Sequence, residues 1–129
     1  MPKIVVVGGF VECKHSGRTK LKSGNAKLKI GGAEVVIAGG EVGVSFMPLT
    51  VPPTPPTPDN PAPCIQQTAA GTPSPCAITL LATSGISTKI KVDGVGVLLD
   101  TASGLATNPN DPSAQWTISD AGQALMEEA

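Results

Sequence analysis

Aromatic side chains are scarce in this chain of 129 residues, which contains 2 Phe, 1 Trp and no Tyr. A hydrophobic core must therefore be built from Val, Ile, Leu and Ala, and we expect it to be thin. Thin cores in small domains often need an added constraint, such as a metal or a disulfide. The scarcity also leaves no aromatic residue within the basic stretch 14–29 on which a nucleobase could stack.

Charge is nearly balanced, because 9 Lys and Arg oppose 10 Asp and Glu and give a formal net charge of −1. This balance gives no reason to expect nucleic acid or a membrane surface as a partner. Basic residues do gather in one stretch, which we interpret as a solvated face rather than a polyanion site. Its members are Lys14, Arg18, Lys20, Lys22, Lys27 and Lys29.

Long hydrophobic runs are absent from the sequence. The apolar run 4–7 is too short for the core of a signal peptide, and no stretch is long enough to span a bilayer. We therefore expect the chain to be synthesised and folded in the cytoplasm without a signal peptide. Cysteines in a reducing cytosol more often bind metal or stay free than form disulfides.

Recognisable catalytic motifs are missing as well. The sequence contains no Gly-x-Ser-x-Gly motif, phosphate-binding loop or His-Glu pair, and its carboxylates are scattered. The opening 3–9 is similar to the first strand of a dinucleotide-binding unit, but an extended stretch follows where that unit needs a helix. We predict that the chain is not an enzyme.

Glycine and proline are abundant, at 15 and 13 residues, which favours short strands joined by turns over helices. We predict an all-β protein, a small cone or pyramid of short β-hairpins that forms one domain over 1–129. A Pro-rich connecting loop at 47–63 should extend as polyproline II, and 113–129 should form a C-terminal strand and tail.

Two segments, 23–39 and 84–100, share one order of features. Each opens on Ser-Gly, alternates lysine with aliphatic residues, turns at Gly-Gly or Asp-Gly, and ends in an aliphatic run. Successive strand residues face opposite sides, so we expect the lysines in water and the aliphatic side chains in the core. Gly31-Gly32 and Asp93-Gly94 suit two-residue type I′ turns. We interpret the segments as two internal hairpin repeats. Two unrelated hairpins would look similar if they used the same turn and strand residues.

Three further stretches have the composition of strands, namely 3–7, 77–82 and 115–119. The last of them contains Trp116, the one large apolar residue of the chain. We expect its indole to seal an edge of the core.

The sequence holds three cysteines and one histidine, which together make a Cys₃His set: Cys13, His15, Cys64 and Cys76. This set is typical of closed, tetrahedral structural zinc sites, because thiolates and imidazole suit Zn²⁺ better than Mg²⁺ or Ca²⁺. In the Cys13-x-His15 spacing both side chains would share one strand face, so a common metal is geometrically possible. We expect a buried structural zinc that pins the hairpins and has no open coordination position.

Three alternatives to a metal site stay open at this stage. Cys64 and Cys76 would form a disulfide that leaves Cys13 unpaired, all three thiols would be free and buried, or His15 would simply cap a turn. The sequence lacks the Cys-x-x-Cys pairs that indicate a zinc site by their spacing, so it does not distinguish among these alternatives.

The order of His15-Ser16-Gly17, Ser23-Gly24 and the hairpin 27–40 resembles the signature of PAAR-type spike-tip proteins of contractile injection systems. In that family a His-Gly loop precedes a Ser-Gly turn and a hydrophobic hairpin. The second hairpin, 89–100, and Cys76 before it are similar to the same unit. The Pro-Ala-Ala-Arg stretch of the family is replaced here, and the usual His-rich ligand set is Cys-rich, so the resemblance indicates a divergent PAAR-like branch.

The resemblance implies a structural tip protein that caps and sharpens the spike of a type VI secretion system or phage-tail-like particle. One copy would sit on a homotrimeric β-helical spike protein, with Cys13, His15, Cys64 and Cys76 around an apical zinc. Effector cargo is a further possible partner, and a target membrane would be contacted only on firing. The protein would leave the cell as part of the particle.

Two other functions compete with this expectation. The chain would serve as a free-standing β-rich adaptor whose Pro-rich segment binds a proline-reading partner. A small metalloenzyme would instead need an open metal position, which a complete Cys₃His shell does not offer.

Overall fold

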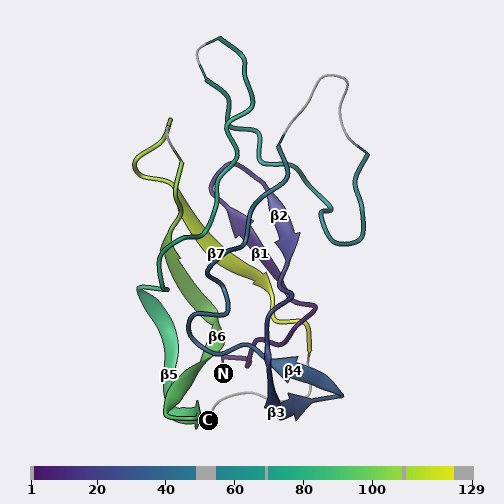
Figure 1. The fold of residues 1–129 in the computed structure, drawn as a ribbon, viewed down its shortest axis with the longest axis vertical. Coiled ribbons are helices and arrows are strands. Elements are labelled where there is room, and N and C mark those ends of the chain that lie inside the picture. The colour runs from purple at the N-terminus through teal and green to yellow at the C-terminus, as the bar shows by residue number, and fades with distance from the viewer. Residues whose placement is uncertain (1, 49–54, 69, 109, 124–129) are drawn as a thin grey trace.

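The chain folds into two antiparallel β-sheets, and the all-β prediction is confirmed. This computed structural model describes residues 2–48, 55–68, 70–108 and 110–123, apart from the side chain of Ala26, and contains no helix among them that could cross a membrane. Its strands, drawn in Figure 1, are β1 (Phe10–Cys13), β2 (Arg18–Lys20), β3 (Asn25–Ile30), β4 (Ala33–Val35), β5 (Ser84–Val92), β6 (Val95–Leu105) and β7 (Gln115–Asp120).

The larger sheet has the strand order β2-β1-β7-β6-β5, and β3 and β4 form the smaller sheet. The C-terminal strand β7 therefore lies in the middle, where it pairs with both β1 and β6. Hairpin tips lie at one end of the long axis, and long loops extend from the other end (Figure 1).

Both expected hairpins are present, as β3–β4 and β5–β6. Gly31 and Gly32 have φ values of 59° and 84°, and Asp93 and Gly94 have 54° and 81°. Positive φ at both central residues is the requirement of a type I′ turn, so this prediction is confirmed. That the two hairpins are repeats of one ancestral unit stays a prediction.

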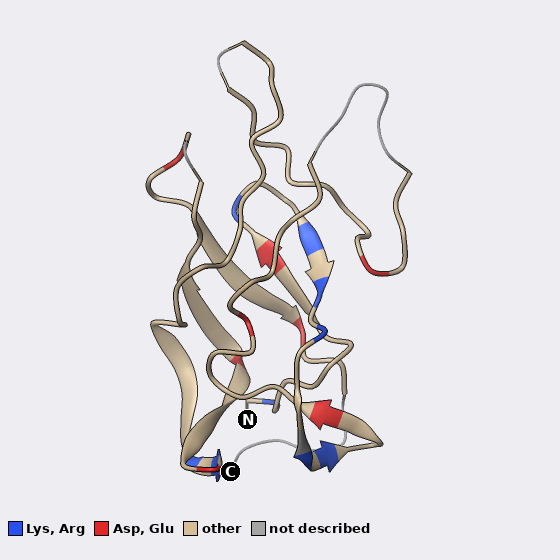
Figure 2. Ribbon diagram, viewed as in Figure 1, with Lys and Arg blue, Asp and Glu red and all other residues tan. Residues whose placement is uncertain are grey.

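The expected alternation along the hairpins is also confirmed. All four lysines of β3 and β5 are exposed, whereas Ile30 and Val92 are buried on the opposite faces. The inward residues of both hairpins pack in one hydrophobic cluster with Ile4 and Val6 of the N-terminal segment. Lys27 Nζ lies 2.7 Å from Asp93 Oδ1 and joins β3 to the turn between β5 and β6. Figure 2 shows this charged end of the molecule.

The N-terminal stretch expected as a strand is extended, but it divides its pairing between the two sheets. Val5 N–H donates to Leu98 O at 2.9 Å, and Val7 N–H donates to Glu34 O at 2.8 Å. Ile4, Val5 and Val6 are fully buried. The segment thus links the sheets instead of extending one ladder. The strand expected at 77–82 is wrong, since only single bridges from Ala77 form there.

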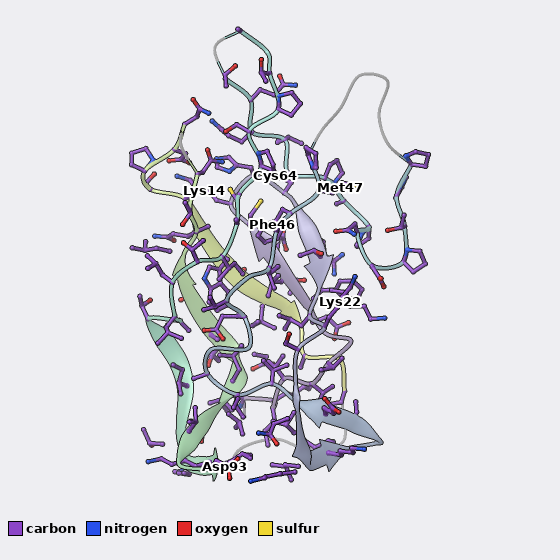
Figure 3. All side chains as sticks on the ribbon, in the orientation of Figure 1. Lys14, Lys22, Phe46, Met47, Cys64 and Asp93 are labelled. Atoms are coloured by element: carbon purple, nitrogen blue, oxygen red, sulfur yellow. The ribbon has the colours of Figure 1, made fainter. Side chains whose placement is uncertain are left out.

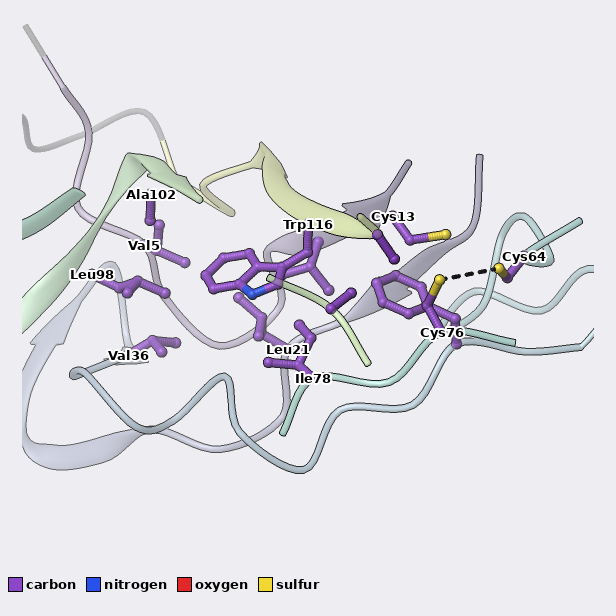
Figure 4. Packing of buried hydrophobic residues seen from close by; sticks show 14 of the residues in the cluster. Val5, Cys13, Leu21, Val36, Cys64, Cys76, Ile78, Leu98, Ala102 and Trp116 are labelled. Carbon is purple, nitrogen blue, oxygen red and sulfur yellow. Dashed lines mark hydrogen bonds between the residues drawn. The ribbon is translucent and has the colours of Figure 1, made fainter. Parts of the chain in front are cut away.

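The main core surrounds Trp116, whose side chain is fully buried on the central strand β7 (Figure 4). The indole is therefore the middle of the core, and the expectation that it seals an edge is wrong. Its Nε1 is buried without a hydrogen-bond partner among the described residues, so ring packing has to offset that loss. Gly104 lies opposite Trp116 in the β6–β7 register and lets the ring lie flat against the backbone.

Only part of the predicted Pro-rich loop can be assessed, because 49–54 lie outside the described residues, as do 124–129 of the predicted tail. Among its described prolines, Pro55, Pro56 and Pro58 are exposed, whereas Pro48, Pro61 and Pro63 are partly buried. After them, Asp59 Oδ2 lies 3.2 Å from Lys22 Nζ and its Oδ1 lies 3.5 Å from Lys20 Nζ. The hydrogen bond from Lys22 lowers the pKa of Asp59. These pairs neutralise part of the basic stretch.

Glu41 is a fully buried acidic residue that joins its own turn to the segment before β5. Its Oε2 accepts from Gly39 N–H at 2.9 Å, and its Oε1 accepts from Ala82 N–H at 3.0 Å. A glutamine cannot accept with both terminal atoms. We expect Glu41→Gln to lower the free energy of unfolding by about 1–3 kcal/mol in urea titrations, because one buried N–H loses its acceptor. Glu34→Gln, at a partly exposed position, is the control, and equal loss in both variants would contradict this role.

The contact between Gly104 and Trp116 supplies a second stability prediction. A Cβ at Gly104 would lie 2.8 Å from Trp116 Nε1. We expect Gly104→Ala to lower the free energy of unfolding by about 1–3 kcal/mol, because the indole must shift within a packed core. Fluorescence of the single tryptophan during urea unfolding measures the change. Thr101→Ala, at an exposed position of the same strand, should have little effect, and equal midpoints for the two variants would overturn the prediction.

Candidate metal centre

Cys13, His15, Cys64 and Cys76 converge on one point of the structure. Their candidate ligand atoms all lie within 4.8 Å of one another. The three cysteines are buried, at 3%, 0% and 1% exposure, and His15 is partly buried. Figure 4 shows the three sulfurs at the edge of the main core. All four residues predicted from the sequence are thus brought together.

Cys13 and His15 reach this point from different local structures. Cys13 is the last residue of β1 and pairs with Trp116 of β7. His15 lies in the following tight turn, where Ser16 has a φ of 68° and its N–H donates to Cys13 O at 3.1 Å. The expectation that the two side chains share a strand face is therefore wrong. The turn, rather than strand alternation, carries the imidazole back over the sulfurs.

Gly17 closes this turn directly beneath the cluster. Its N–H donates to Cys13 Sγ at 3.2 Å, and its carbonyl accepts from Cys13 N–H at 2.8 Å. A Cβ at this position would lie 2.9 Å from both Cys13 Sγ and Cys64 Cα. Glycine is therefore the residue that allows the turn and the Cys64 backbone to approach the same sulfur.

Cys64 and Cys76 stand at the two ends of a long loop and are fixed by the same neighbouring segment. Cys64 N–H donates to Met47 O at 2.8 Å, and Phe46 N–H donates to Cys76 O at 3.1 Å. Ile65 N–H also donates to His15 O at 3.1 Å. The last of these bonds holds the Cys64 end of the loop against the turn after β1, although about fifty residues of sequence separate the two.

The donor spacing suits a four-coordinate metal. Cys64 Sγ lies 3.7 Å from Cys76 Sγ, and His15 Nδ1 lies 3.3 Å from Cys76 Sγ. Bond lengths of about 2.3 Å to sulfur and about 2.0 Å to nitrogen place the donors of a tetrahedral zinc about 3.5–3.8 Å apart. Small side-chain adjustments would therefore complete the shell. The residues present fit a metal ion of this coordination.

Burial controls the protonation of the thiols in the metal-free protein. Burial, followed by the hydrogen bond with Cys64, raises the pKa of Cys13 to about 12. Burial also raises the pKa of Cys76. Cys13 and Cys76 are consequently neutral at pH 7 without a metal, and a metal has to displace their protons to bind.

Two residues that the sequence reading missed contact the centre from the loop between β6 and β7. Asp111 Oδ2 lies 2.8 Å from His15 Nε2, and Asn108 Nδ2 donates to Cys76 Sγ at 3.2 Å. Hydrogen bonds from Ser113 lower the pKa of Asp111. The only sequence signal was the Asn- and Pro-rich composition of 108–112, which indicates a turn but not a role at a metal centre.

The centre lies far from the hairpin turns. In Figure 3, Asp93 is labelled at the lower end of the molecule and Cys64 in its upper part, below the long loops. The sulfurs belong to the main core, whereas the hairpin tips pack in the second cluster. The expectation that one ion pins the hairpins is therefore wrong. A metal here would join β1 to the long loop instead.

The three cysteines are free in this structure, with no disulfide between Cys64 and Cys76. The geometry thus leaves a metal site or a cluster of buried thiols. Comparison with protein-family models, curated proteins and solved structures gives no match. The assignment of the centre therefore depends on its own chemistry.

We expect one metal ion per chain in protein purified without chelators, measured by elemental analysis. Cys64→Ser and Cys76→Ser should each lose the metal and lower the melting temperature, because a hydroxyl is a poor substitute for a thiolate ligand. Asp93→Asn, at the distant hairpin turn, should retain both. A metal content below one tenth of an ion per chain in the unaltered protein, even after refolding with Zn²⁺, would overturn the assignment.

Proposed function

We propose that this protein is a structural tip that caps and sharpens the trimeric spike of a contractile injection apparatus, with zinc as its bound metal. The convergence of Cys13, His15, Cys64 and Cys76 is the observation that carries this proposal. Soft thiolates and one imidazole favour zinc among common divalent ions. Their arrangement is what the resemblance to PAAR-type proteins leads one to expect at an apex.

The distribution of stabilising contacts supports a mechanical role. At the hairpin end, backbone ladders and aliphatic packing hold the chain together. At the loop end, 14–17, 64–68 and 70–76 lie outside the named strands and are held by isolated backbone hydrogen bonds and by side chains. A metal bonded to both segments would resist axial deformation at that end. We propose that the loop end leads during puncture and the hairpin end contacts the spike.

A complete Cys₃His shell leaves no coordination position for a substrate or for an activated water. This supports a structural rather than a catalytic metal. We propose a homotrimeric β-helical spike protein as the partner, with one copy of this chain per trimer. Effector cargo, assembly in the cytoplasm, and membrane contact only on firing belong to the same proposal.

The stoichiometry of the complex tests this function. The purified chain, mixed with the trimeric spike of its own particle, should elute as one copy per three spike chains in size exclusion with light scattering. A single tip has to cover a threefold axis, so further copies are sterically excluded. Absence of binding, or a ratio of three to three, would reject the tip function.

Exposure of Pro55, Pro56 and Pro58 favours one competing function, an adaptor that presents its Pro-rich segment. Deletion of 51–58 separates the two functions. A tip should bind its spike with unchanged stoichiometry after this deletion, whereas an adaptor should lose its partner.

A further inference from the structure

We propose that the loop joining β6 and β7 forms the outer shell of the metal centre, in which Asp111 makes Nδ1 the ligand atom of His15 and Asn108 stabilises the Cys76 thiolate. This inference rests on the proposed metal centre and deepens it. It names Nδ1 as the ligand atom of His15. It also gives positioning roles to Asp111 and Asn108, which belong to a loop that contributes no ligand itself.

Asp111 determines which nitrogen of His15 faces the metal. Its Oδ2 lies 2.8 Å from Nε2, and the two side chains are 17% and 14% exposed. Ser113 donates to the Oδ1 of Asp111 through its N–H at 3.0 Å and its hydroxyl at 2.8 Å. A carboxylate so held can only accept from the ring, so Nε2 must carry the hydrogen. The lone pair is then on Nδ1, which lies 3.3 Å from Cys76 Sγ.

Asn108 acts on the sulfur side of the centre and is itself fixed in orientation. Its Oδ1 accepts from Asn110 N–H at 2.9 Å, which leaves the amide nitrogen to point the other way. Nδ2 donates to Ser74 O at 2.9 Å and to Cys76 Sγ at 3.2 Å. The residue is 7% exposed. A fixed N–H beside a thiolate offsets part of the repulsion among three anionic sulfurs.

The two contacts act together because they come from one short loop. Asn110 Nδ2 adds a bond of 2.6 Å to Ser74 Oγ, two residues before Cys76. Asn108 and 110–113 therefore contact the imidazole on one side and the chain around Cys76 on the other. Such outer partners orient ligands, and their loss typically weakens metal binding about 10- to 100-fold.

Isosteric variants test this role without creating cavities. Asp111→Asn keeps the shape but replaces one acceptor oxygen with an N–H donor, and Asn108→Asp places a carboxylate against the sulfur. Competition with a chromophoric chelator measures the affinity for Zn²⁺, and visible absorption of the Co²⁺ form reports the ligand field. We expect each variant to bind Zn²⁺ about 10- to 100-fold more weakly than the unaltered protein. Asp93→Asn, the surface control, should be unchanged.

Nuclear magnetic resonance of ¹⁵N-histidine in the zinc-loaded, unaltered protein tests the ligand atom independently of any variant. The single histidine should show a protonated Nε2 and a metal-bound Nδ1. Zinc bound through Nε2, or variant affinities within twofold of the unaltered protein, would overturn the outer shell while leaving the metal centre intact. Failure of the unaltered protein to bind either Zn²⁺ or Co²⁺ would instead overturn the centre and the outer shell together.

Discussion

The close approach of three buried sulfurs and one imidazole is the constraint on which the loop end of this molecule depends. Thiols can share such a space as small hydrophobic groups, and burial keeps Cys13 and Cys76 neutral in the absence of metal. Three thiolates in the same space would repel one another strongly without a cation. A metal therefore changes this cluster from a weak apolar contact into a set of bonds between β1, its turn and the long loop.

The two ends of the molecule reach stability by different means. At the hairpin end, type I′ turns and alternating side chains satisfy backbone hydrogen bonds and bury aliphatic residues locally. The loop end lacks such ladders, but it is not separate from the core. Phe46 is buried in the cluster that contains Cys76 and donates its N–H to the Cys76 carbonyl. Release of the loop would therefore disturb the main core as well as the metal shell.

The sequence predicted what depends on local pattern. Asp93-Gly94 favours a turn with positive φ at both central residues. Lysine alternating with aliphatic residues gives each strand a solvent-exposed face and a buried face, so the hairpins could be predicted from the residues themselves. The Cys₃His set was also visible in the sequence, which left a metal site, a disulfide, free thiols and a turn-capping His15 open. That the set converges was a hypothesis from composition, and the structure supports its geometry.

What the sequence did not predict depends on contacts between distant segments. The segment containing Val5 has the pattern of a buried strand, but no local rule indicates that it divides its bonds between two sheets. Asp111 is an ordinary turn residue until the fold places it 2.8 Å from His15 Nε2. The expectation that Trp116 seals an edge of the core takes no account of which strands neighbour β7. The strand order makes β7 central and therefore places the indole in the middle.

Surface-to-volume scaling explains why a metal suits the loop end better than more apolar packing. A small domain buries a limited share of its surface, and among the aromatic side chains of the described residues only Trp116 and Phe46 are buried here. A tetrahedral centre needs only four short side chains, and its bonds are directional where hydrophobic contacts are not. Gly17 illustrates the economy of space, because even one added methyl would contact Cys13 Sγ and the Cys64 backbone at 2.9 Å. The close approach of the turn to the sulfurs thus requires a residue without a side chain at position 17.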